Sequence, residues 1–254
     1  MLQKRVVVCL DVRDGRTVKS VQFENTRELG DPVAMAEAYY RQGVDELVFY
    51  DITASAEKRG IMIDVVRRVA ERIFIPFCVG GGLATAEDIK AVILAGAEKV
   101  SLNSQAVKNP QLISQGATMY GSQSIVLAID AKADASMPSG YRVVINGGRT
   151  PTDLDVLAWA RQGHSLGAGE IVLNSIDADG TKAGYELTLT KMISEALPIP
   201  VVASGGAGTP EHLRAVLQEG KADAALVASM VHYGTYTLAQ IKGELAAHGV
   251  AVRR

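Results

Sequence analysis

Cysteine, tryptophan and long apolar stretches are scarce in this sequence of 254 residues, which contains 2 Cys and 1 Trp. Cys9 and Cys78 lie in apolar runs without Cys-x-x-Cys spacing, which excludes a disulfide framework and indicates reduced core residues. The apolar runs are far shorter than the roughly 20 residues that cross a bilayer, and the N-terminal residues show no secretory signal pattern. We therefore expect a cytoplasmic protein with no membrane partner.

An excess of charge of either sign is also absent. Lys and Arg number 26 against 28 Asp and Glu, so the formal net charge is −2. A nucleic-acid partner normally requires a basic surface, and we expect none here. The 4 His residues show no metal-ligand spacing, so we expect neither a metal nor another cofactor.

The chain instead contains a regular alternation of apolar runs and helical patterns. The runs are continuous in Val, Ile, Leu and Ala, which is typical of parallel strands covered on both faces. Eight such strands are predicted, at 5–10, 46–50, 75–79, 98–102, 124–129, 170–173, 199–203 and 224–228. Segments with helical spacing lie between them, and Asp31-Pro32 and Thr209-Pro210 are typical helix starts. The pattern predicts an α/β protein with one domain, 1–254, folded as a closed (β/α)₈ TIM barrel; an open doubly wound sheet remains the alternative.

The second half of the sequence repeats the first in four places, at offsets of 119 to 125 residues. The matched pairs are 9–13 with 128–132, 46–49 with 170–173, 79–82 with 203–206, and 97–104 with 222–229. One order and nearly one offset indicate a twofold half-barrel repeat, with halves at about 1–121 and 122–254. The least regular segment, 131–151, contains a strand-like run at 141–145 and predicts an excursion after the fifth strand.

Two aspartates are the leading candidates for chemistry. Asp11 and Asp130 end the first and fifth predicted strands, which lie opposite each other in an eight-stranded barrel. Opposed carboxylates can serve as acid and base on two sides of a substrate. A single Asp at a strand end often only caps a turn, but the duplicated pair favours catalysis.

Glycine-rich turns follow the third and seventh predicted strands, at 79–82 and 204–208. A lone glycine turn is weak evidence, but two related turns predict a ligand with two phosphates, because glycine lets main-chain N–H groups approach an anion and a helix follows each turn. Asn103-Ser104 and Ala228-Ser229 end the neighbouring strands and add donors, and Asp179-Gly180-Thr181 follows the sixth strand.

Charged residues stand at or near the opposite ends of four strands. They are Arg5, Glu46, Lys99 and Glu170. Such residues usually form a solvated rim, although their alternating signs would also permit a ring of salt bridges.

Four segments closely resemble one enzyme family, the cyclase subunits of imidazole glycerol phosphate synthase. The segments are 9–15, 45–55, 146–149 and 177–185, and the resemblance extends over nearly the whole chain. It implies a (β/α)₈ barrel that uses ammonia and a bis-phosphorylated ribulosyl-formimino aminoimidazole carboxamide ribotide. The products are imidazole glycerol phosphate, for histidine synthesis, and an aminoimidazole carboxamide ribotide. The ammonia comes from a glutaminase partner, with which the subunit forms a heterodimer.

The same resemblance implies residue roles. Asp11 and Asp130 become the acid/base pair, and Lys19 a residue of a mobile first loop that helps to close the site. The residues around the phosphates become Gly82, Asn103, Ser104, Asp179, Gly180, Gly206, Ala228 and Ser229. The four charged residues at the barrel base become the ammonia gate, at the surface on which the glutaminase docks. Ser20, Asn174 and Glu98 depart from the usual residues of the family, as does the stretch 161–165, and none of them removes a catalytic group.

Three other functions fit parts of the same pattern. The sister isomerase of the pathway shares the two-phosphate half-barrel logic but needs no ammonia entry. A cyclase-like paralogue could amidate a sugar with its own amidotransferase. A noncatalytic phosphate-binding barrel would have no need of two opposed carboxylates.

Overall fold

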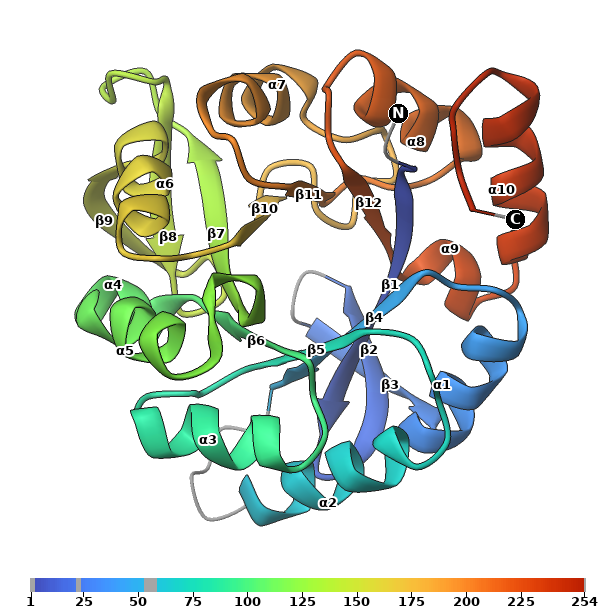
Figure 1. The fold of residues 1–254 in the computed structure, drawn as a ribbon. Helices are drawn as coiled ribbons and strands as arrows, with labels where there is room; N and C mark the ends of the chain where they lie inside the picture. Colours follow the sequence, from blue (N-terminus) through green and yellow to red (C-terminus); the bar gives the residue numbers. More distant parts are fainter. Residues whose placement is uncertain (1–2, 22–23, 53–58, 254) are drawn as a thin grey trace.

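The computed structural model describes residues 3–21, 24–52 and 59–253, and its centre is a closed barrel of eight parallel strands (Figure 1). The strands are β1 (Arg5–Arg13), β4 (Glu46–Asp51), β5 (Phe77–Gly80), β6 (Lys99–Leu102), β7 (Ile125–Ala133), β10 (Glu170–Ser175), β11 (Val201–Ser204) and β12 (Ala224–Val227). The barrel closes because β1 pairs in parallel with both β4 and β12. The predicted barrel is confirmed, and the open sheet is wrong.

Helices form a layer around the barrel (Figure 1). They are α1 (Pro32–Arg41), α2 (Arg59–Ala70), α3 (Ala86–Leu94), α4 (Ser104–Lys108), α5 (Gln111–Tyr120), α6 (Val156–Ser165), α7 (Leu187–Ala196), α8 (Pro210–Gln218), α9 (Ser229–His232) and α10 (Leu238–Ala247); a short 3₁₀ turn spans Ser122–Ser124. The expected helix starts are confirmed: the side chains of Asp31 and Thr209 cap α1 and α8, each followed by a proline in the first turn.

Two apolar layers explain why the strands read as continuous hydrophobic runs. One cluster joins residues from seven of the eight barrel strands, all but β6, among them the alternate residues Val7 and Cys9 of β1 and Val126 and Ala128 of β7. The residues between them, such as Val8, pack in the larger cluster together with the helices. Successive strand side chains point to opposite faces, so the first cluster fills the barrel interior and the second the space beneath the helices.

Two antiparallel hairpins extend from the mouth end of opposite strands. β8 (Tyr141–Ile145) and β9 (Thr150–Asp155) follow β7, which confirms the expected excursion. β2 (Arg16–Val21) and β3 (Glu24–Gly30) follow β1, where we expected a mobile loop. The backbone of 16–21 is thus a strand of a hairpin, and the mobility of this segment stays a prediction. Asp14-Gly15, with φ of 50° and 76°, forms a two-residue turn, and Asp-Gly is a strong hairpin signal.

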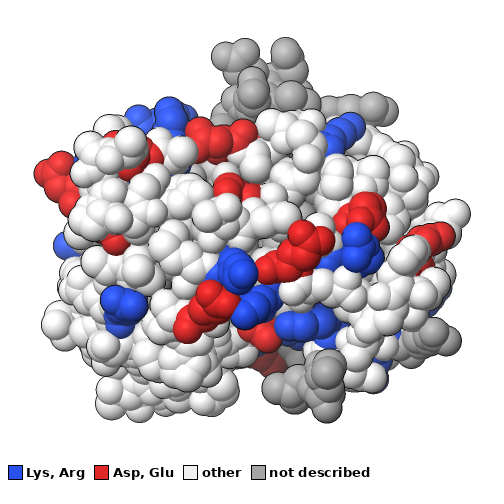
Figure 2. Space-filling view, turned by 90° about the horizontal axis from the view of Figure 1, so that it is seen from above, with Lys and Arg blue, Asp and Glu red and all other residues white. Residues whose placement is uncertain are grey.

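The surface carries both signs of charge. On the face seen in Figure 2, basic and acidic side chains lie interspersed among the coloured residues, without a broad area of one sign. Within the described ranges, no helix has the length and apolar character needed to cross a membrane.

Candidate active site

Two aspartates, one from each of two opposite strands, lie at the barrel mouth, where the parallel strands end. Asp11 is two residues beyond Cys9 on β1, and Asp130 is two residues beyond Ala128 on β7. Cys9 and Ala128 belong to the interior cluster, so both carboxylates lie on the inner face of the barrel, above its apolar filling. β1 and β7 are separated by three strands on either side of the closed barrel, which places the two carboxylates on opposite sides of the mouth.

Asp130 is held by two side-chain amides. Asn174 Nδ2 donates to Oδ1 at 3.0 Å, and Asn103 Nδ2 donates to Oδ2 at 2.9 Å. Ser204 Oγ donates to Asn174 Oδ1 at 3.1 Å and fixes the orientation of that amide. Burial raises the pKa of Asp130 above its ordinary value, although the two amides act in the opposite direction.

The contact of Asn174 with Asp130 was not predicted, and Ser204 was expected only as part of the glycine turn at 204–208. A signal was present, because Asn174 is two residues beyond Val172, an interior residue of β10, and therefore points inward at the mouth. Asn103 was expected at a phosphate, but in this structure its amide is directed to Asp130.

Asp11 has different surroundings. The Cys9 thiol lies 3.7 Å from Asp11 Oδ1, and the strand register places Tyr50 of β4 beside Asp11. The hydroxyl groups of Tyr50 and Ser101 lie 3.4 Å apart, and burial raises the pKa of Tyr50 well above its ordinary value, as do the neighbouring Cys9 and Cys78. The two aspartates thus occupy equivalent places on the barrel with unequal partners.

Both glycine turns bring the main chain very close to a neighbouring strand. A Cβ on Gly81 (φ 99°) would lie 2.1 Å from the carbonyl oxygen of Asp51, and a Cβ on Gly205 (φ 91°) would lie 2.6 Å from that of Ser175. Gly206 is equally confined, because its Cβ would lie 1.9 Å from Gly184 O. These glycines are required by backbone packing, and the same feature leaves main-chain groups uncovered by side chains.

The helices next to the glycine turns begin in two ways. α3 begins four residues after the first turn (79–82) and α8 two residues after the second (204–208), and the side chains of Thr85 and Thr209 cap them. The short helices α4 and α9 follow β6 and β12 directly, and their N-caps, Asn103 and Ala228, provide no side-chain capping bond. Loops after strands seven and eight and a short extra helix commonly bind phosphate in this fold.

The remaining candidates have distinct positions. Ser104 and Ser229 are the first residues of α4 and α9. Ser104 Oγ accepts a hydrogen bond from the main-chain N–H of Asn146 at 2.9 Å. Gly82 and Gly180 adopt left-handed φ values of 66° and 75°. Asp179 and Gly180 lie in an exposed turn after β10, where Asp179 N donates to Ser175 O at 2.9 Å. Lys19 lies in β2, and its side chain is outside the described part of the structure, as are residues 53–55 of the motif at 45–55.

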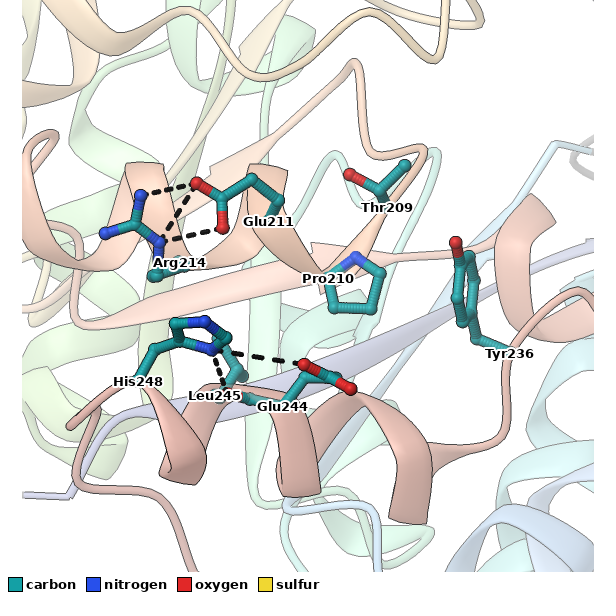
Figure 3. A pocket seen from close by; sticks show the side chains of 8 residues that line it. All are labelled: Thr209, Pro210, Glu211, Arg214, Tyr236, Glu244, Leu245 and His248. Atoms are coloured by element: carbon teal, nitrogen blue, oxygen red, sulfur yellow. Dashed lines mark hydrogen bonds and ion pairs between the residues drawn. The ribbon is translucent and has the colours of Figure 1, made fainter.

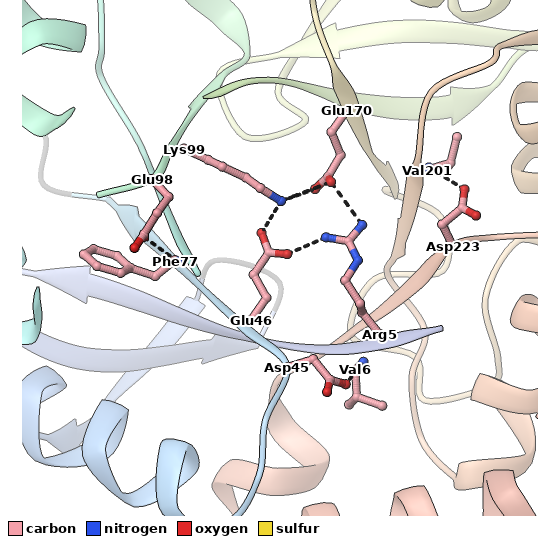
Figure 4. Close-up of polar contacts among 10 residues, drawn as sticks. All are labelled: Arg5, Val6, Asp45, Glu46, Phe77, Glu98, Lys99, Glu170, Val201 and Asp223. Atoms are coloured by element: carbon pink, nitrogen blue, oxygen red, sulfur yellow. Dashed lines mark hydrogen bonds and ion pairs between the residues drawn. The ribbon is translucent and has the colours of Figure 1, made fainter. Parts of the chain in front are cut away.

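A closed ring of ion pairs lies at the other end of the barrel (Figure 4). Arg5 pairs with Glu46 and, at 3.0 Å, with Glu170, while Lys99 pairs with the same two carboxylates at 2.8 and 3.1 Å. Arg5, Glu46 and Glu170 are each two positions before an interior residue of their strand, so the ring closes the barrel interior from below. The salt-bridge ring is therefore present, and the simple solvated rim is wrong, because Glu46 and Glu170 are only 3% and 6% exposed.

The ring depends on mutual compensation of charge. Burial raises the pKa of Glu46, with a further contribution from Glu170. Burial alone would lower the pKa of Lys99, but the carboxylates of Glu170 and Glu46 outweigh it and raise that pKa above its ordinary value. Two cations and two anions leave the ring with no net charge, as expected for charges held away from water.

A second set of carboxylates at the base joins neighbouring strands and was not predicted. Asp45, Glu98 and Asp223 accept the main-chain N–H groups of Val6, Phe77 and Val201 at 2.8, 3.0 and 3.0 Å (Figure 4). Each carboxylate residue immediately precedes a barrel strand. These carboxylates link the starts of neighbouring strands around the ring.

A cavity of about 380 Å³ lies away from the mouth, between α8 and α10 (Figure 3). Its charged groups are occupied with one another: Glu211 binds Arg214 through both carboxylate oxygens, and His248 lies beside Glu244. We assign it no ligand. No group of three or more potential metal ligands occurs in the described ranges.

Comparison with known proteins gives a consistent result over the whole chain. A family described as histidine biosynthesis protein matches residues 5–237. The imidazole glycerol phosphate synthase subunit HisF of Desulfatibacillum aliphaticivorans is 64% identical over 256 residues, covering 100% of this chain and 98% of that protein. Proteins of the same name from Desulforapulum autotrophicum and Nitratidesulfovibrio vulgaris are 63% and 59% identical, each over 100% of this chain and 99% of the relative.

Proposed function

Because the chain belongs to the HisF family, the cyclase subunits of imidazole glycerol phosphate synthase in histidine biosynthesis, we propose that Asp11 and Asp130 carry out ammonia-dependent ring formation at its barrel mouth. The substrate is the bis-phosphorylated ribulosyl-formimino aminoimidazole carboxamide ribotide. The observation that carries this proposal is the placement of the two carboxylates on opposite strands above a closed apolar interior.

The chemistry requires protons to be removed and supplied at one place. The ammonia nitrogen attacks the ribulosyl carbonyl carbon, the carbonyl oxygen leaves as water, and the aminoimidazole carboxamide ribotide departs as the imidazole ring closes. The entering nitrogen loses protons, while the departing oxygen and nitrogen gain them. Carboxyl groups on either side of the reacting atoms can exchange these protons in both directions. The raised pKa of Asp130 supports such a role, because a pKa closer to the working pH lets the carboxyl group both donate and accept a proton.

The two phosphates of the substrate fit the two glycine turns. The turn after β5 has Ser104 beside it on the next strand end, and the turn after β11 has Ser229 in the corresponding place. Main-chain N–H groups and serine hydroxyls are typical phosphate donors. The exposed turn that contains Asp179 and Gly180 covers the second of these sites in the proposal.

The relatives are named as subunits, so this chain is one subunit of a larger complex. We assign the partner, a glutaminase, to the barrel base, where the ring of Arg5, Glu46, Lys99 and Glu170 is the entry for ammonia. The helices of the barrel lead back to the strands at this end. Two large apolar side chains are exposed there: Phe74, shortly before β5, is 81% exposed, and Leu94, the last residue of α3, is 72% exposed. Exposed large apolar side chains beside a charged cluster are typical of a protein interface.

The direct test uses the purified chain without a partner. With the bis-phosphorylated precursor and ammonium at alkaline pH, where free ammonia is present, we expect formation of imidazole glycerol phosphate and aminoimidazole carboxamide ribotide. Glutamine in place of ammonium should give no product until a glutaminase subunit is added. Isomerisation of an upstream ribotide without ammonia, or mere binding without turnover, would contradict the proposal.

A further inference from the structure

The turn at 146–149, between β8 and β9, has a left-handed backbone. Asn146, Gly147 and Gly148 have φ values of 56°, 67° and 79°, so three consecutive residues lie in the left-handed region. Asn and Gly adopt this region more readily than other residues, and Asn-Gly is typical of hairpin turns, so the sequence itself favours this backbone. The turn therefore holds its main-chain groups in fixed directions.

The turn is connected to α4 on one side and to the loop after β10 on the other. The Asn146 main-chain N–H donates to Ser104 Oγ at 2.9 Å, across 42 residues of sequence. Gly148 packs on Ile176, since a Cβ at Gly148 would lie 3.0 Å from Ile176 Cδ1. The turn is closed internally by Asn146 Nδ2 donating to Thr150 Oγ1 at 3.1 Å and by Arg149 Nε donating to Asn146 O at 2.8 Å.

The bond to Ser104 determines what that hydroxyl can do. A serine hydroxyl has one proton to donate and two lone pairs to accept with. Because Asn146 N–H occupies a lone pair, the hydroxyl proton is directed to another acceptor. Ser104 is the first residue of α4 at the end of β6, next to the glycine turn that follows β5.

We propose that the turn at 146–149 is a positioning element, which fixes the Ser104 hydroxyl as a proton donor toward the substrate phosphate at the glycine turn after β5. The inference rests on the proposed function, because it needs a phosphate at that turn. It assigns substrate affinity, not the chemical step, to residues 146–149.

The test is a double-mutant cycle between the turn and the hydroxyl. Gly148→Val places a branched side chain at a left-handed position and against Ile176, which displaces the turn. Ser104→Ala removes the hydroxyl. The matched control is Gly140→Val, which puts the same strain (φ 82°) at the other end of the β8 hairpin, where an added Cβ has no neighbour within 4 Å. Ammonium-dependent kinetics give kcat and KM for the bis-phosphorylated substrate, and thermal unfolding checks that each variant is folded.

We expect Ser104→Ala and Gly148→Val each to raise KM about tenfold, the loss of one hydrogen bond to a charged group, with kcat nearly unchanged. The double variant should have the KM of Ser104→Ala alone, and Gly140→Val should have the native KM. If Gly148→Val raises KM by the same factor with and without the hydroxyl, the positioning role is overturned.

Failure of the proposed function gives a different result. If Ser104→Ala leaves KM unchanged, the phosphate assignment at this turn fails and the inference fails with it, and Ser229→Ala then tests the second phosphate site separately. If Gly148→Val does not fold, Asn146→Ala replaces it in the same cycle. That substitution removes the bond to Thr150 and makes the left-handed conformation less favourable, so the same non-additivity is expected.

Discussion

The side-chain amide of Asn103 donates to Oδ2 of Asp130 at 2.9 Å, while its own carbonyl oxygen is buried without a hydrogen-bond partner among the described residues. The pair is therefore satisfied on the carboxylate side only. A rotation of the Asn103 amide by 180° would offer an acceptor to Asp130 in place of a donor. The Asn103 amide can therefore donate to Asp130 when the carboxyl group is ionised and, after rotation, accept a hydrogen bond from it when the carboxyl group is protonated.

The first prediction concerns stability and pH. Burial raises the pKa of Asp130, so the folded chain binds this proton more strongly than the unfolded chain, and stability is lost as pH rises through the folded pKa. Asp130→Asn should therefore raise Tm at pH 7, with the gain disappearing below about pH 4, where the native carboxyl is protonated in both states. Thermal unfolding across pH measures this.

An opposite response provides the control. Hydrogen bonds from Ser136 and Arg142 lower the pKa of Asp134 to about 2, so its contribution to stability is present above its ordinary pKa and is lost as pH falls toward 2. Asp134→Asn should lower Tm at pH 7. An Asp130→Asn variant that is less stable at pH 7 and equally so at pH 4 would contradict the assigned burial effect.

The second prediction concerns the ring at the base. Lys99→Met leaves Glu46 and Glu170 buried with one cation between them, and we expect a loss of about 3 kcal/mol, or roughly 10 °C in Tm. Lys221→Met removes an exposed pair with Glu195 and should cost less than about 1 kcal/mol. Equal losses in chemical denaturation would show that the ring is not desolvated.

The third prediction separates confinement from backbone strain at the glycine turns. Gly81→Ala combines a left-handed φ with a Cβ 2.1 Å from Asp51 O, whereas Gly180→Ala has a left-handed φ and open space. Gly180→Ala should cost about 1 kcal/mol, and Gly81→Ala more than about 3 kcal/mol because strand backbone must move. Denaturant titration of both variants checks the difference, and similar values would mean that β4 and the turn are not in close contact.

Much of this architecture could be predicted from the sequence, because the determining signals are local or repeated. Continuous apolar runs such as 125–129 specify strands buried on both faces, and Asp31-Pro32 specifies a helix start. The duplicated matches are sufficient to place Asp11 and Asp130 at equivalent strand ends. The hairpin after β1 could also have been predicted, since Asp14-Gly15 is a direct hairpin signal.

Other features are contacts between side chains that are distant in the sequence and meet only in the folded barrel, so local sequence patterns do not predict them. Asn103 was expected at a phosphate, yet its amide reaches Asp130 from a neighbouring strand. The contact between Asn146 and Ser104 joins positions 42 residues apart. The charged ring could be proposed from strand starts, but its closure required the barrel register that brings Arg5 and Lys99 to the same two carboxylates.

The fourth prediction concerns the partner surface. Phe74 is 81% exposed and contacts Tyr40 edge-on, so Phe74→Asp should change stability by less than about 1 kcal/mol. It should lower affinity for the glutaminase subunit at least about tenfold, since burying a new carboxylate at an interface is costly. Titration calorimetry gives the affinity, and Met119→Asp on α5 tests how far the interface extends. Unchanged affinity in Phe74→Asp would place the partner elsewhere.

The most direct measurement of the central claim is the ammonium-dependent turnover of Asp11→Asn and Asp130→Asn, each with substrate affinity measured separately. We expect each amide to reduce kcat at least about a hundredfold, the ordinary contribution of a proton-transferring group, while binding of the bis-phosphorylated substrate stays within about threefold of the native value. Near-native kcat in both variants would show that the two carboxylates at the barrel mouth do not perform the chemistry.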